Sequence, residues 1–120
     1  MNESLSIRKA VSSDLDRLLT LYLHLSVNNV PFSLSTAEDV FVRFSQCDGS
    51  VIFLGEIGDE LVTSCTIVIV PNLTRNAASY ALVENVVTHS DHRCKGYGKL
   101  LLDAATHHAW DYDCYKVMLM

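Results

Sequence analysis

The chain has 120 residues, of which 49% are hydrophobic and 19% charged, with a formal net charge of −5. This length fits one domain, residues 1–120, with a core large enough to fold without a disulfide or a metal. The acidic balance argues against a general affinity for nucleic acid or for anionic membrane surfaces.

The sequence carries no signal for export or membrane insertion. No apolar run approaches the roughly 18 residues needed to span a bilayer, and residues 1–8 lack the apolar segment of a signal peptide. The four cysteines have no C-x-x-C spacing and stand at Cys47, Cys65, Cys94 and Cys114. We therefore expect a cytoplasmic protein with reduced thiols.

The first part of the chain predicts a short strand and then a helix. Apolar and polar residues alternate over residues 5–10, as in a strand. Ser13, with Asp16 three residues later, resembles a capping box at the start of a helix. We expect this helix to end near residues 28–29, before Pro31, and its apolar residues recur at helical spacing: Leu15, Leu18, Leu19, Tyr22 and Leu25.

A second helix and a β-hairpin follow. Ser35 and Glu38 form another capping-box pattern, with a short apolar stripe behind it. Residues 51–54 and 61–70 are rich in β-branched and aromatic residues and enclose a Gly58-Asp59 turn, which predicts a β-hairpin.

The last third of the chain predicts one more β-α-β unit. We expect a strand over residues 80–88, a helix over 98–110 and the start of a final strand over 115–120. The whole order is then β-α-α-β-β-β-α-β. Its last unit requires a right-handed crossover between two parallel strands.

A glycine-rich loop joins the expected strand at residues 80–88 to the helix that follows it. Gly96 and Gly98 lack side chains where the backbone turns, so a bulky anion can approach the amides closely. The start of the helix adds unpaired N–H groups and a partial positive charge. Three cations surround this loop in an otherwise acidic chain, which indicates a phosphate-binding site: Arg93, Lys95 and Lys99.

Two common phosphate-binding motifs do not fit this loop. A P-loop requires a serine or threonine after its Gly-Lys pair, but Leu100 follows Gly98-Lys99. A dinucleotide-binding fingerprint requires a third glycine where Leu101 stands. The chain also ends before an acidic residue could follow at the required distance.

The pattern that does fit is R-x-x-G-x-G, at Arg93-Cys94-Lys95-Gly96-Tyr97-Gly98. It resembles the pyrophosphate loop of the GNAT superfamily of N-acetyltransferases. The preceding strand, with Glu84 and then Val86-Val87, and the following run of residues 99–102 resemble the same family, as does the order of elements. The resemblance implies an α/β fold, more narrowly α+β, with a mixed and mostly antiparallel sheet flanked by helices and a β-α-β acetyl-CoA-binding unit.

The family resemblance also implies how acetyl-CoA binds. The cofactor would enter a V-shaped opening between the strands at 80–88 and 115–120. Backbone groups of Val86, Val87 and Thr88 would pair with the pantetheine arm and the thioester. The pyrophosphate would be held by Arg93 and by loop and helix amides, those of Cys94, Lys95, Gly96, Tyr97, Gly98 and Lys99.

The implied reaction is transfer of the acetyl group to a primary amine of a small molecule or a protein by direct attack. The N–H of Val86 would hold the oxyanion. Glu84 would act as a general base, in many relatives through a water molecule, or would instead orient the substrate ammonium. His89 and His92 flank Asp91 at a turn that is solvated in the family, so we expect no metal.

The sequence departs from the family at its C-terminal end. It stops at Met120, inside the strand that would form one wall of the cofactor cleft, and no residue matches the tyrosine that commonly protonates the CoA thiolate. We expect either a fragment of a longer protein or a short protein that completes itself as a homodimer. The rival functions are a catalytically silent acyl-CoA-binding or assembly module and a phosphate-loop protein for another nucleotide.

Overall fold

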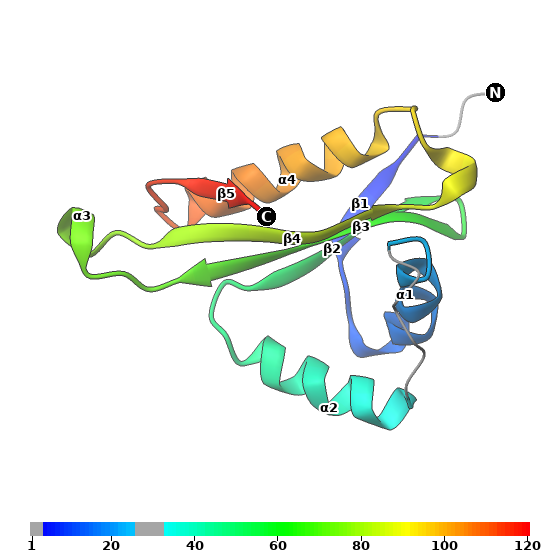
Figure 1. The fold of residues 1–120 in the computed structure, drawn as a ribbon, viewed down its shortest axis with the longest axis horizontal. Coiled ribbons are helices and arrows are strands. Elements are labelled where there is room, and N and C mark those ends of the chain that lie inside the picture. The colour runs from blue at the N-terminus through cyan, green and yellow to red at the C-terminus, as the bar shows by residue number, and fades with distance from the viewer. Residues whose placement is uncertain (1–3, 26–32) are drawn as a thin grey trace.

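A computed structural model describes residues 4–25 and 33–120 (Figure 1). Within these residues, a 5-stranded sheet has its strands in chain order. Neighbouring strands are antiparallel, except that β4 and β5 are parallel. The predicted mixed, mostly antiparallel sheet is confirmed, with these bounds: β1 (Ser6–Lys9), β2 (Val51–Ile57), β3 (Glu60–Val70), β4 (Tyr80–Thr88) and β5 (Val117–Leu119).

Three longer helices flank the sheet. Helix α4 (Tyr97–Asp111) lies along one face, whereas α1 (Leu15–Tyr22) and α2 (Leu34–Ser45) lie on the other (Figure 1). Helix α4 connects β4 to β5 and is the predicted crossover between parallel strands. Shorter helical turns occur at η1 (Ser12–Asp14), α3 (Thr74–Ala77) and η2 (Ser90–His92). No helix in the described part of the chain is long and apolar enough to cross a membrane.

The alternation of side chains along the strands divides the core into two clusters. On the α4 face, Leu101, Ala105 and Ala109 are fully buried against the sheet. The two alanines let the helix backbone approach the strands closely. On the opposite face, Leu18 and Leu54 are the most deeply buried members of a second cluster between α1 and the sheet.

Both predicted capping boxes are wrong, although both helices exist. The α1 helix follows the η1 turn, where Asp14 rather than Ser13 accepts a backbone hydrogen bond, from Val11 N at 2.8 Å. The N-cap of α2 is Ser33, two residues before the expected Ser35, because Ser33 Oγ accepts a hydrogen bond from Thr36 N at 3.2 Å. Helix α1 ends at Tyr22, with Leu23 as its C-cap, so the expected helix end near residues 28–29 is wrong. Residues 28–29 themselves lie outside the described residues.

A network of charged side chains fastens α1 to the edge of the sheet. The buried Asp14 carboxylate accepts two hydrogen bonds from Arg8, at 2.7 and 2.8 Å. Arg17 bridges Asp14 at 3.2 Å and Glu56 at 2.9 Å, and Arg8 Nε reaches Glu56 at 2.7 Å. The hydrogen bonds from Arg8 hold the pKa of Asp14 well below its usual range and also lower the pKa of Glu56. These contacts make α1 a firmly held element.

Candidate functional site

The glycine-rich loop forms an uncapped helix start. Gly96 is the N-cap of α4 and adopts a left-handed conformation, with φ 80° and ψ 8°, which glycine accepts readily. No side chain caps this end, and an early helical bond runs from Leu100 N to Gly96 O at 3.2 Å. The amides of the first turn, at residues 97–99, therefore have no partner within the helix. Such amides together with the helix dipole favour an anion.

Gly98 lies in this first turn, next to the end of β4. A Cβ atom added at Gly98 would lie 3.6 Å from Thr88 Oγ1, an ordinary contact, and its φ is not in the left-handed region. The fold itself therefore has no need of a glycine here, in contrast to position 96. The absence of a side chain at Gly98 instead leaves space for a group that approaches the start of α4 from outside.

The cations of the loop are used in different ways. Arg93 donates from Nε to Thr88 O at 3.2 Å and from Nη2 to His24 O at 3.0 Å. Its guanidinium thus ties the loop to β4 and to the end of α1. Lys99 lies 3.6 Å from Asp103 on the exposed side of α4, and Lys95 is exposed. Arg93, Lys95 and Lys99 are all exposed, so all three contribute positive charge to the surface around the loop.

A β-bulge interrupts β4 just before the loop. Thr66 of β3 is opposite Glu84 and Ser64 is opposite Val87, so Cys65 faces two residues, Asn85 and Val86. Asn85 adopts φ 53°, a left-handed conformation. The extra residue bends the strand and shifts the residues after it by one position.

The bulge separates two stretches of β4 with different partners. Strand β5 pairs with β4 over Ala81, Leu82 and Val83, and the last bond runs from Met120 N to Val83 O at 3.0 Å. His89 donates its N–H to Val62 O of β3 at 2.8 Å. Neighbouring strand residues direct their N–H groups to alternate sides, so that of Val87 also faces β3. Val86 and Thr88 therefore direct theirs away from β3, where no described strand is paired with them.

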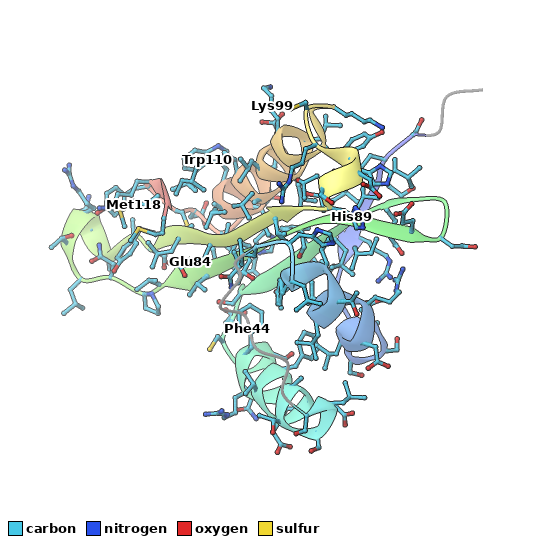
Figure 2. All side chains as sticks on the ribbon, turned by 45° about the vertical axis from the view of Figure 1, so that its right-hand side comes forward. Phe44, Glu84, His89, Lys99, Trp110 and Met118 are labelled. Carbon is cyan, nitrogen blue, oxygen red and sulfur yellow. The ribbon has the colours of Figure 1, made fainter. Side chains whose placement is uncertain are left out.

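Glu84 lies at the start of the bulge. Because it is directly opposite Thr66, both side chains project from the sheet face that carries α1 and α2. The Glu84 side chain is exposed, and Figure 2 shows it on β4, away from α4. The structure thus brings Glu84 and the open amides of Val86 and Thr88 within one short stretch of a single strand.

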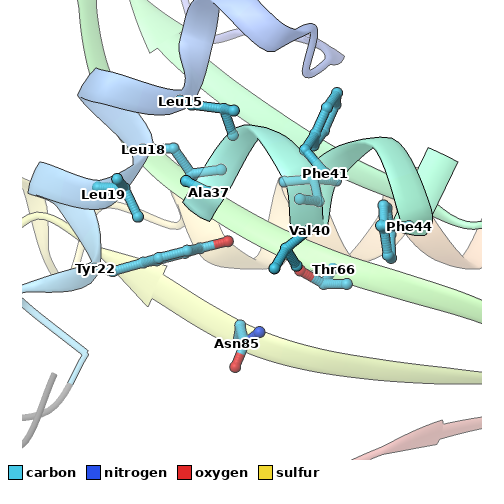
Figure 3. Close-up of a pocket in the computed structure, with 11 residues that line it drawn as sticks. Leu15, Leu18, Leu19, Tyr22, Ala37, Val40, Phe41, Phe44, Thr66 and Asn85 are labelled. Carbon is cyan, nitrogen blue, oxygen red and sulfur yellow. The ribbon is translucent and has the colours of Figure 1, made fainter. Parts of the chain in front are cut away.

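A cavity of about 230 Å³ lies on this same face, between α1, α2 and the sheet (Figure 3). Eight of its 11 lining residues are aliphatic or phenylalanine, and the others are Tyr22, Thr66 and Asn85. Burial raises the pKa of Tyr22. This cavity was not predicted from the sequence. Its only signal there was the apolar stripes of the two helices.

The family resemblance implied a solvated turn before the loop. In the structure, the histidines of this turn instead contact other side chains. The His89 ring lies 4.1 Å from that of His24, centroid to centroid, and 5.7 Å from that of His92. His92 Nε2 also lies 3.2 Å from Glu60 Oε1. In the portion of the chain that the structure describes, no group of three or more His, Cys, Asp or Glu side chains could hold a metal ion.

Comparison with known proteins places this geometry in a family. The model of the acetyltransferase (GNAT) family matches residues 15–120. A protein of Agrobacterium tumefaciens assigned as an acetyltransferase is 39% identical, with a TM-score of 0.89, over 96% of this chain and 80% of that one.

Two more distant structures share the fold. Glucosamine-6-phosphate N-acetyltransferase of Arabidopsis thaliana is 24% identical, with a TM-score of 0.89, over 98% of this chain and 82% of its own. A Clostridium acetobutylicum protein assigned as an acetyltransferase, solved with acetyl-CoA, is 16% identical, with a TM-score of 0.78, over 98% and 80% of the two chains. The family match over residues 15–120 and the relative at 39% identity show that this chain belongs to the GNAT acetyltransferase family.

Proposed function

We propose that this chain binds acetyl-CoA at the loop of residues 93–99 and transfers the acetyl group to a primary amine. The observation that carries the proposal is the uncapped start of α4, where Gly96 is left-handed and Gly98 leaves space next to Thr88. The residues present suit a pyrophosphate, because the start of α4 offers unpaired amides and carries exposed lysines at positions 95 and 99. In this arrangement Arg93 is a positioning residue for the loop.

The amides of Val86 and Thr88 supply the next part of the proposed site. Since they point away from β3, an extended chain such as the pantetheine arm can pair with them as an added strand would. The N–H of Val86 is then suited to donate a hydrogen bond to the thioester oxygen, where negative charge develops. We propose that the bulge at Asn85 serves to aim this N–H, because it sets the direction of the strand immediately before it.

In the proposed reaction, the neutral amine nitrogen forms a bond to the thioester carbonyl carbon and the carbon–sulfur bond breaks. The amine loses a proton to Glu84, directly or through a water molecule, and the CoA thiolate takes up a proton from solvent. We assign no side chain as the general acid. The cytoplasm is the proposed location, where the exposed Cys47 and Cys94 would remain reduced.

Two variants test the two halves of this proposal. Gly98→Ala should weaken acetyl-CoA binding by about 10-fold or more, because the added methyl fits the fold but occupies the space at the amides. Isothermal titration measures the affinity, and thermal unfolding without ligand checks that the fold is unchanged. An unaltered affinity in a folded Gly98→Ala protein would remove this loop from the cofactor site.

Glu84→Gln should lower kcat by about 10²-fold at neutral pH and change the pH profile, with little effect on acetyl-CoA affinity. Glu38→Gln is a matched control, because Glu38 is also exposed but lies in a separate hollow between α2 and the η1 turn. Tight acetyl-CoA binding with no transfer to any amine would favour the silent acyl-CoA-binding module instead.

A further inference from the structure

The cavity between α1, α2 and the sheet has the size of a small organic group. Its volume is about 230 Å³, whereas an apolar cavity of about 150 Å³ is enough to hold a benzene ring. Phe41 and Phe44 line one side from α2, and Leu18 and Leu19 line the other from α1 (Figure 3). These walls offer dispersion contacts and almost no hydrogen-bonding groups, so a polar molecule would lose its hydration there without compensation.

The polar end of the cavity lies at the bulge of β4. Thr66 and Asn85 line the cavity, and Glu84 is the neighbour of Asn85 in the strand and of Thr66 across the sheet. A carboxylate at this position attracts an ammonium group. The cavity and the proposed reaction centre are therefore adjacent, with an apolar wall at one end and a negative charge at the other.

The two helical walls are held differently. Helix α1 is fixed to the sheet by the ion pairs of Asp14 with Arg8 and of Arg17 with Glu56. Its Leu15, Leu18 and Leu21 are buried. Within α2, Ala37 is the buried residue, and Val40 is 46% exposed although it lines the cavity. A wall with so little buried area can shift to fit an occupant at small energetic cost.

From these observations we infer that the acceptor is a small primary amine carrying one ring or a compact apolar chain. The apolar group enters the cavity between α1 and α2, and the amine remains at Glu84. This inference rests on the proposed acetyl transfer and adds the substrate class. It disfavours polyhydroxylated amines and polyamines, since eight of the 11 lining residues are apolar and could not pair with additional hydroxyl or ammonium groups.

The test compares 2-phenylethylamine with ethanolamine as ligands of the protein saturated with CoA. Titration or ligand-observed NMR gives the two dissociation constants without any need for turnover. We expect 2-phenylethylamine to bind about 10- to 100-fold more tightly, the effect of burying one phenyl group.

Two α2 variants locate the binding site. Val40→Lys places a charged chain at the cavity and should reduce 2-phenylethylamine binding by about 10-fold or more, while CoA affinity stays unchanged. Val42→Lys is the matched control, because Val42 is 57% exposed and is not part of the cavity lining. It should bind both ligands as the unaltered protein does.

The outcomes distinguish the two proposals. If CoA does not bind, the proposed function fails, and the acceptor class fails with it. If CoA binds but the two amines bind equally, or Val40→Lys acts no differently from Val42→Lys, the inference about the acceptor is wrong while acetyl-CoA binding stands. Preference for the aromatic amine that is lost only in Val40→Lys supports the inference.

Discussion

The two faces of the sheet are built in opposite ways. On the α4 face, Leu101 and the alanines at 105 and 109 are fully buried, and helix and sheet are in close contact. On the other face, α1 packs closely but α2 leaves a cavity of about 230 Å³. The filled face holds the start of α4 in a fixed position relative to β4. In the proposed function the hollow face leaves room for the acceptor, and rigidity and selectivity would then lie on different sides of one sheet.

The largest expected effect is a difference in unfolding free energy between substitutions on the two faces. Leu101→Ala removes a side chain with 0% exposure and should lower the free energy of unfolding by about 2–5 kcal/mol. Phe44→Ala, in the cavity wall, should cost only about 1 kcal/mol because the side chain is partly exposed already. Urea denaturation of both variants measures this difference. Equal losses would mean that the α2 face is packed as firmly as the α4 face.

A somewhat smaller effect should distinguish α1 from α2 within the hollow face. Asp14→Asn should lower the free energy of unfolding by about 2–3 kcal/mol, because it removes a buried charge while its arginine partners stay partly solvated. The side chain of Asp14 is 5% exposed and that of Arg8 is 40% exposed. Asp39→Asn, an exposed position on α2, is the control and should be near neutral. Similar losses at both positions would contradict a firmly fixed α1.

The same network predicts the direction of the pH dependence. The pKa of Asp14 and that of Glu56 are lowered in the folded state, chiefly by hydrogen bonds from Arg8. Their stabilisation is fully present above the unfolded-state pKa, about 4, and is lost as pH falls through the folded-state values. Unfolding free energies at pH 7, 5 and 3 should therefore decrease toward acid, with a smaller decrease in Asp14→Asn. An equal decrease in both proteins would show that other groups govern acid stability.

Much of the α4 side could be predicted from sequence. The hairpin around Gly58, the helix after Gly98 and the R-x-x-G-x-G loop each depend on residues close together in the chain, and each appears in the structure. Gly96 was identified as a site for close approach of an anion, and its left-handed φ adds a conformational reason for a glycine.

The features that were missed depend on contacts between distant segments. Arg93 donates to the carbonyl of His24, 69 positions earlier in the chain, which no local pattern indicates. The bulge at Asn85 is defined by its pairing with Cys65. The cavity could not be predicted, because the apolar stripes of α1 and α2 show which sides of the helices face inward but not how far apart the helices lie.

The smallest effect concerns the reactivity of the four cysteine thiols, which can be measured without a substitution. Burial raises the pKa of Cys65 to about 12 and also raises that of Cys114, so their thiols should react slowly with iodoacetamide at pH 7.5. Cys47 and Cys94 are exposed and should react first. Mass spectrometry of time points measures the order, and CoA should slow Cys94 but not Cys47. Equal protection of both by CoA would argue against a site at the loop.

Acetyl-CoA binding at the loop and acceptor binding in the α1–α2 cavity together require two ligand sites that meet at the bulge of β4. Backbone NMR spectra of the labelled protein, recorded with CoA alone and with 2-phenylethylamine added, test this most directly. CoA should shift the amides of residues 86–88 and 94–99, and the amine should then shift those of Thr66, Asn85 and the α2 residues lining the cavity. The two sets should border each other at Glu84. Ligands that perturb one common set, or an amine that leaves α2 unperturbed, would contradict the division of the two substrates between the start of α4 and the α1–α2 cavity.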